Sequence, residues 1–224
     1  MIFDPLYIML AIPGLLLGLY ATWKTKSTFK RYHQYAASSR MTGAQAARRL
    51  LDREGLQAVQ VEPVQGFLSD HYDPRSRTLR LSPDVYQSPS LAAIGVACHE
   101  AGHAIQHATQ YAPLQLRSAL VPVTQFGSNM VYFIFFIGLL MNQPLLVNGA
   151  ILLFTAVVLF TLVTLPVEWD ASARAKRLMV AAGIVSEQER ADAGRVLNAA
   201  FLTYVSALVS SLLTLLYFIM RARR

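Results

Sequence analysis

The chain has 224 residues, of which 54% are hydrophobic and only 15% are charged, and this excludes an ordinary soluble domain, which averages about 25% charged residues. The net charge of +7 does not indicate a nucleic-acid-binding protein, because the basic residues flank apolar runs instead of forming a block with interleaved aromatic residues. Cys98 is the single cysteine, so an internal disulfide is excluded.

Three stretches without any charged residue predict the membrane spans: Pro5–Trp23, Ser118–Val167 and Val196–Met220. About 20 apolar residues are needed for a helix to cross the hydrocarbon core, so the first and third stretches each hold one span. The second is long enough for two, with a turn at Asn142-Gln143-Pro144. We therefore expect an N-terminal transmembrane helix within 1–23, retained as an anchor, and further spans at 119–141, 145–166 and 197–220.

The segments between the spans, 24–118 and 167–195, carry 12 and five of the 20 Lys and Arg residues. Four spans place both segments on one side of the membrane, and a basic bias marks the cytoplasmic side. The expected location is therefore the inner (plasma) membrane, multi-pass, with both segments in the cytoplasm. Only Arg221, Arg223 and Arg224 argue for the opposite orientation.

Within 24–118 the pattern predicts a helix, a hairpin and a second helix. Thr42 can cap an amphipathic helix over Thr42–Glu54, and Gly55 can end it. Phe67–Tyr72 and Thr78–Leu81 are typical of short strands, with a turn at Asp73-Pro74-Arg75-Ser76.

The second helix is expected to begin with Ser88 as N-cap and Pro89 at its first helical position, and to run to about Gln110. It contains His99-Glu100-Ala101-Gly102-His103. Histidines four residues apart lie on one face of a helix, about 6 Å apart, where both can bind one zinc ion. Glu100 lies beside that face and can act as general base toward a water that zinc acidifies.

Two neighbouring residues are assigned other roles. His107 lies about 12 Å from His99 along a straight helix, too far for the same ion, so it is expected to support a ligand, face solvent or contact substrate. Cys98 points away from the ligand face and is expected to be a packing residue.

A catalytic zinc ion usually has three protein ligands and one open position. Glu168, just past the third span, is the best candidate for the third ligand, although an acidic residue there could also be an interfacial helix cap. Asp170 is the second candidate, and His71 in the hairpin is a weaker one.

These motifs resemble the YugP-type bacterial membrane zinc metallopeptidases, through the N-terminal span, the hairpin of Phe67–Tyr86, His-Glu-Ala-Gly-His and Leu165-Pro166-Val167-Glu168-Trp169-Asp170-Ala171-Ser172. More distantly the chain is similar to the HtpX and CAAX prenyl protease group. The resemblance implies His99, His103 and Glu168 as ligands, Glu100 as base, a cytoplasmic site and a role in membrane-protein quality control. Ser172 stands where that group has an aspartate that orients a ligand histidine, and serine can accept such a hydrogen bond only without charge.

The expected fold is an α-helical integral membrane protein with four transmembrane helices and a small α+β gluzincin-like metalloprotease domain. The expected function is that of a zinc-dependent endopeptidase with one catalytic Zn²⁺. It is expected to be embedded in the lipid bilayer and to act on peptides or membrane proteins. Three alternatives remain: an intramembrane site-2-type metalloprotease, a catalytically silent adaptor that retains the fold, and a zinc hydrolase for a non-peptide bond.

Overall fold

The computed structural model describes residues 4–223, and their side chains except at positions 126–129. It divides into two compact units. The first, called the helical unit here, consists of Met1–Ala21, Ala112–Pro166 and Thr203–Arg224. The second, called the sheet unit, consists of Thr22–Tyr111 and Val167–Leu202. Positions 1–3 of the expected first span and Arg224 lie outside the described residues.

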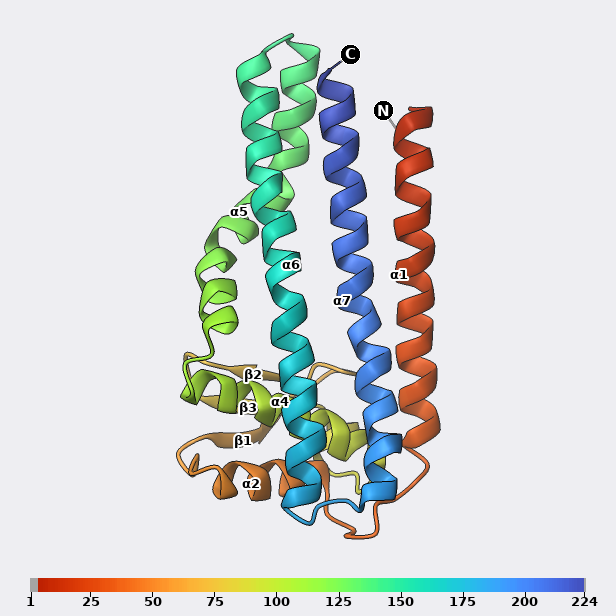
Figure 1. Ribbon diagram of the computed structural model, residues 1–224, viewed down its shortest axis with the longest axis vertical. Helices are drawn as coiled ribbons and strands as arrows, with labels where there is room; N and C mark the ends of the chain where they lie inside the picture. Colours follow the sequence, from red (N-terminus) through yellow and green to blue (C-terminus); the bar gives the residue numbers. More distant parts are fainter. Residues whose placement is uncertain (1–3, 224) are drawn as a thin grey trace. The chain divides into compact units, whose positions relative to one another are not determined.

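Among residues 4–223, three helices are long and apolar enough to cross a membrane: α1 (Pro5–Tyr32), α6 (Pro144–Ala181) and α7 (Glu187–Ala222) (Figure 1). A fourth helix, α5 (Ala112–Leu140), has two halves inclined by 50°, which together make at most one further span. The helices therefore agree with a helical membrane protein of three to four spans, and each long helix continues beyond its apolar stretch.

The helical unit is held by aromatic and small-residue packing. Phe135 of α5 stacks on Phe218 of α7 with ring centroids 4.0 Å apart. At the end of the unit, Asp4 accepts a hydrogen bond from Tyr217 and lies 3.8 Å from Arg221, so the start of α1 and the end of α7 meet (Figure 1). Two ends on one side favour an even number of crossings, and hence α5 as a fourth span.

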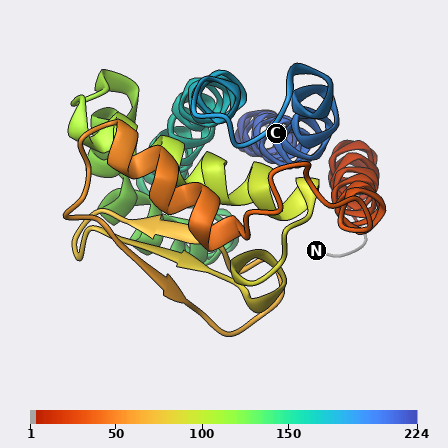
Figure 2. The same cartoon turned by 90° about the horizontal axis from the view of Figure 1, so that it is seen from below.

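The sheet unit contains one three-stranded sheet in the order β1-β3-β2. Strand β1 (Gln60–Pro63) pairs in parallel with β3 (Thr78–Leu81), and β2 (His71–Asp73) pairs antiparallel with β3. Helices α2 (Gly43–Arg53) and α4 (Leu91–Ala108) lie side by side on one side of the sheet (Figure 2). The short helix α3 (Pro83–Tyr86) connects β3 to α4.

Helix α2 confirms the expected amphipathic helix. The hydroxyl of Thr42 accepts from the backbone of Gln45, and the Gln45 side chain accepts from the backbone of Thr42, which closes a capping box. Gly55 follows with φ +76°, a conformation that glycine adopts at little cost, so the helix ends there.

The expected start of α4 was wrong by two residues. Ser90, and not Ser88, is the N-cap, and its hydroxyl accepts from the backbone of Ala93. The carbonyls of Ser88 and Pro89 instead accept hydrogen bonds from Gly43 and Ala37, which holds this stretch extended against the segment before α2.

The expected strand Phe67–Tyr72 was also wrong for most of its length, since β2 begins only at His71. Gly66 has φ +114° and Leu68 has φ +53°, and these left-handed conformations are incompatible with a strand. The strand β1 was not expected from the sequence, because it is short, mostly exposed and ends in proline.

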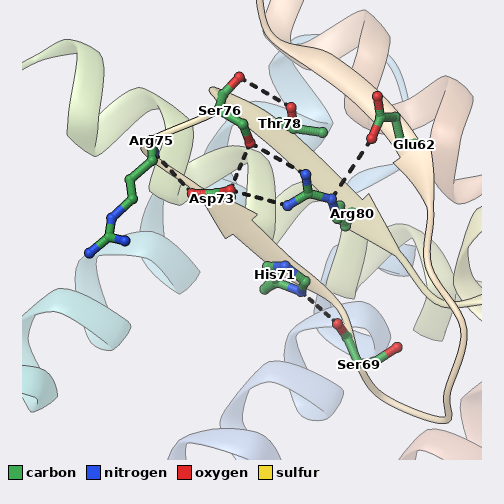
Figure 3. A network of polar contacts seen from close by, with 8 residues as sticks. All are labelled: Glu62, Ser69, His71, Asp73, Arg75, Ser76, Thr78 and Arg80. Atoms are coloured by element: carbon green, nitrogen blue, oxygen red, sulfur yellow. Dashed lines mark hydrogen bonds and ion pairs between the residues drawn. The ribbon is translucent and has the colours of Figure 1, made fainter. Parts of the chain in front are cut away.

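A network of charged residues ties the three strands together (Figure 3). Asp73 accepts from the Ser76 hydroxyl and the Arg75 backbone, which forms the expected turn. Arg80 of β3 pairs with Asp73 at 3.2 Å and with Glu62 of β1 at 3.8 Å. The hydrogen bonds from Ser76, Arg75 and Arg80 hold the pKa of the Asp73 carboxyl well below its usual range, so the turn is stabilised at neutral pH.

Helix α4 is the centre of the sheet unit, between the sheet and the parts of α6 and α7 that belong to this unit (Figure 2). Two glycines allow the close approach: a Cβ at Gly95 would lie 3.2 Å from the Ala193 carbonyl oxygen, and one at Gly102 only 2.8 Å from that of Ala171. Helix α6 is therefore fixed against the turn of α4 that carries the two motif histidines.

Candidate metal centre

Helix α4 presents His99 and His103 on the face that meets α6. Their ring centroids are 4.8 Å apart and nearly perpendicular, and the side chains are only 13% and 12% exposed. The opposite faces of α4 are covered by apolar neighbours, with Ala97, Ala101 and Ile105 in the core of the unit. The helix is therefore packed on its apolar faces, and the strip that carries the two histidines is largely covered by α6.

Glu168 of α6 is brought directly against both histidines. Its Oε2 lies 3.2 Å from Nε2 of His99 and 3.5 Å from Nε2 of His103. One ligand atom from each of the three residues lies within 4.8 Å of the other two, so the group could hold a metal ion. Tetrahedral zinc with bonds of about 2.1 Å needs ligand atoms about 3.4 Å apart, which the two shorter separations match.

The charge of the group also suits a cation. Glu168 is 2% exposed, and this burial alone would raise the pKa of its carboxyl, but hydrogen bonds and charges from His103 and His99 lower that pKa well below its ordinary range. Burial disfavours the charged form of His103, yet Glu168 and then Glu100 raise the pKa of that ring. The site thus holds an ionised carboxylate between two imidazoles.

In each imidazole, Nδ1 lies within hydrogen-bonding distance of a polar side chain on the side away from Glu168. Nδ1 of His99 lies 3.1 Å from the Ser172 hydroxyl, which is the hydrogen bond that serine was expected to accept. Nδ1 of His103 lies 3.0 Å from Oε1 of Gln106. Because Nδ1 is engaged in both rings, the Nε2 atoms are the ones that face Glu168 and one another.

Glu100 lies beside this group and is not part of it. Its side chain is partly exposed, and its charge acts on both His103 and Asp70. Asp70 precedes β2 and accepts two hydrogen bonds from Ser82; burial first, and the charge of Glu100 among the further causes, raise the pKa of its carboxyl. A partly exposed carboxylate next to the ligand face is able to accept a proton from a water molecule there.

The other residues singled out in the sequence lie elsewhere. Asp170 accepts from Arg174 at 2.6 Å and from Gln106 at 2.9 Å, and is not in the ligand group. His71 is exposed and bonded to the Ser69 carbonyl. Cys98 is fully buried in the core, and burial raises the pKa of its thiol to about 12, as befits a packing residue.

Two residues near the site were not predicted from the sequence. Gln106 is completely buried behind His103. Nothing in the local sequence distinguishes this amide, one turn after the motif, from an ordinary surface residue of a helix. Tyr72 of β2 places its hydroxyl 2.9 Å from Nδ1 of His107. The alternation of side chains along a strand could have placed Tyr72 toward α4 had the bounds of β2 been known.

Comparison with known proteins gives the family. The pattern of the family described as "Putative neutral zinc metallopeptidase" matches residues 7–223. The chain belongs to this family. It is also 47% identical over 215 residues to the "Putative membrane protease YugP" of Bacillus subtilis (strain 168), and the match covers 96% of both chains. No solved structure matches the chain.

Membership of this metallopeptidase family implies zinc as the metal and a peptide as the substrate, in a membrane setting. The donor set fits that metal, because two imidazole nitrogens and one carboxylate oxygen are a common ligand set of catalytic zinc. The resemblance found from the motifs is thereby confirmed.

Proposed function

We propose that this protein is a membrane-bound zinc endopeptidase in which His99, His103 and Glu168 bind one zinc ion and Glu100 is the general base. The observation that carries the proposal is the convergence of three ligand atoms from α4 and α6 within 4.8 Å. Their chemistry is that of a zinc site with one position left open.

The roles of the residues follow from their placement. A bound zinc ion would acidify water and polarise a peptide carbonyl. Glu100 would take the proton from the attacking water and later deliver it to the leaving amine, since its carboxylate lies beside the ligand face and is partly exposed. Ser172 and Gln106 would hold the two imidazoles in position.

The proposal extends to the setting of the reaction. The basic residues of 24–118 and 167–195 support a cytoplasmic site at the inner membrane. Peptides or membrane proteins are then the substrates, and membrane-protein quality control is the process that we infer from the resemblance. A gluzincin-like domain, with a His-Glu-x-x-His helix and a glutamate ligand, is the fold that goes with this chemistry.

The alternatives are less well supported. An intramembrane protease would carry the motif on a spanning helix, whereas α4 is not among the helices of residues 4–223 that are apolar and long enough to span a membrane. A silent adaptor would have no need of a base, yet Glu100 is present beside the ligand group. A zinc hydrolase for another bond would use the same residues, and the family name favours a peptide.

Glu100→Gln tests the proposal. We expect the purified variant to bind one zinc ion per chain, as the wild type does, and to lose at least about 100-fold in the rate of peptide hydrolysis, because the base is removed and the ligands are kept. Zinc content and cleavage of a casein-derived peptide mixture are measured on the same samples. Near-normal hydrolysis by the variant, or a wild type without zinc, would overturn it.

A further inference from the structure

Behind the candidate metal centre lies a chain of polar contacts that the proposed reaction does not use directly. It begins at His103 and continues through Gln106 and Asp170 to Arg174. Arg174 in turn lies over the ring of Tyr111, with 5.7 Å between the guanidinium carbon and the ring centroid. All five residues belong to the sheet unit, on or just after α4 and on α6.

Gln106 is the buried member of this chain, with no exposed surface. Its Nε2 donates to the Val167 carbonyl at 2.8 Å and to Asp170 at 2.9 Å, which uses both of its hydrogens. Its Oε1 faces Nδ1 of His103 at 3.0 Å. The reversed amide would set its oxygen against two acceptors, the Val167 carbonyl and the Asp170 carboxylate, so only one orientation of the amide is favourable.

That orientation decides the state of His103. An amide oxygen can only accept, so Nδ1 of the ring must carry a proton, and the lone pair of the neutral ring is then on Nε2. Nε2 is the atom that faces Glu168 and the other ligand. Asp170 fixes the orientation of the Gln106 amide, and Arg174 holds Asp170 through a contact of 2.6 Å. The charge of the Asp170 carboxylate is therefore separated from the His103 imidazole by the Gln106 amide.

We propose that Gln106 is a positioning residue of the metal site, which holds His103 in the Nδ1–H tautomer, and that Asp170 sets the orientation of the Gln106 amide. The inference rests on the proposed function for its consequence, zinc binding, but the tautomer itself is a property of the chain. A partner behind a ligand histidine commonly changes metal affinity by about 10- to 100-fold when it is removed.

The first test is zinc affinity of the full chain in detergent, measured by competition with a chelator. Gln106→Leu should weaken zinc binding about 10- to 100-fold. Thr109→Val, at the C-cap of the same helix, is the matched control, because among the described residues the Thr109 hydroxyl donates to carbonyls of that helix, and the variant should bind zinc as the wild type does. Affinity of Gln106→Leu within about threefold of the control would overturn the proposal.

A charge-exchange pair separates positioning from packing. Gln106→Glu alone sets two carboxylates against each other and should weaken zinc binding. With Asp170→Asn added, the amide at 170 can donate to the carboxylate at 106, which still accepts from Nδ1 of His103. The Val167 carbonyl still faces a carboxylate oxygen, so part of the lost affinity should return. If the double variant binds no better than the single one, the proposed order of donors and acceptors is wrong. This comparison also decides the matter should Gln106→Leu fail to fold.

A readout on metal-free protein separates this inference from the proposed function. Nitrogen-15 spectra of the imidazoles, recorded on metal-free Glu168→Ala so that no carboxylate faces Nε2, at a pH where the rings are neutral, should show His103 as Nδ1–H. With Gln106→Leu added, the ring should become a mixture of tautomers. A neutral ring protonated on Nε2 in Glu168→Ala would refute the inference even if the wild type binds zinc. The expected tautomer in that variant, together with a wild type that binds no zinc, would instead refute the proposed function alone.

Discussion

Glu168 and Asp170 are two carboxylates on one helix, two residues apart, and they serve different partners. At about 100° per residue their side chains leave α6 in directions about 200° apart, so both cannot face one metal ion. Glu168 is almost fully buried against His99 and His103, whereas Asp170 is engaged by Gln106 and Arg174. The second candidate for the third ligand is thus placed to support a ligand.

This division predicts different effects of removing each carboxylate. Glu168→Ala should lose stoichiometric zinc together with peptide hydrolysis, because two histidines alone hold zinc weakly. Asp170→Ala should still bind one zinc ion per chain at saturation, with an affinity reduced by no more than about 100-fold. Metal content after dialysis and chelator competition give the two quantities.

His107→Ala is the control for this pair. Its ring contacts Tyr72 and lies a turn beyond the ligands, so the variant should keep the metal. Full zinc occupancy in Glu168→Ala would reject that residue as a ligand, and zinc loss confined to Asp170→Ala would transfer the role to Asp170.

At the scale of elements, the position of β2 in the sheet limits where a peptide substrate can dock. A protease must hold its peptide substrate in an extended conformation, and the free edge of a strand near the metal centre can do so. In the sheet, β3 is central, with β1 on one side and β2 on the other, so it has no free edge. The outer edge of β2 has no partner strand among the described residues, and β2 contacts the motif helix α4.

We therefore predict that substrate adds to the sheet along β2. Strand addition uses backbone hydrogen bonds at every second residue of the peptide. In a cleavable peptide whose amides are N-methylated one at a time, KM should rise at alternating positions on the side that binds β2. Unmethylated peptide of the same composition is the reference. A KM that responds at every position, or at none, would exclude this docking mode.

At the scale of the whole molecule, two observations bear on membrane topology. One is the contact of Asp4 with Tyr217 and Arg221, and the other is the distribution of basic residues. The first favours an even number of crossings, and the second favours a cytoplasmic sheet unit. We therefore predict that the turn between α5 and α6, the start of α1 and the end of α7 lie on the outer side of the membrane.

Labelling with a membrane-impermeant maleimide tests this topology, and the native Cys98 does not interfere because it is fully buried. Gln143→Cys, in the turn before α6, should be labelled in intact cells. Arg75→Cys and Gln188→Cys, both at exposed positions of the sheet unit, should be labelled only after permeabilisation. Reaction of either of these two from outside would contradict the assignment.

Features that depend on residues close together in the sequence could be predicted, whereas features that depend on contacts between distant residues could not. The apolar stretches, the Thr42 cap and the histidines four residues apart are local patterns, and each could be interpreted directly. Glu168 needed the family resemblance, because nothing local distinguishes a metal ligand from an interfacial cap. Gln106 could not be found at all, since its role exists only where Val167 and Asp170 of α6 come to rest against α4.

Errors in the local structure had the same origin. Ser88 and Ser90 are equally good caps by residue type, and tertiary hydrogen bonds to Ser88 and Pro89 decide between them. The loop before β2 is apolar enough to suggest a strand, but Gly66 and Leu68 turn it in left-handed conformations. At Ser88 and Pro89, contacts from a distant part of the chain override the local preference, whereas in the loop before β2 the backbone conformation itself ends the strand pattern.

The order of the ligands along the chain has a consequence for biosynthesis. His99 and His103 leave the ribosome before α5 and the apolar part of α6, and Glu168 follows only after them. A nascent chain in which α5 and the apolar part of α6 have not yet been made therefore contains His99, Glu100 and His103 but lacks Glu168, the proposed third ligand. With the proposed ligand set, hydrolytic activity would begin only once the ribosome has passed α5 and the apolar part of α6. A chain that stalls or is truncated inside them would carry α1 as its expected anchor but would be inert.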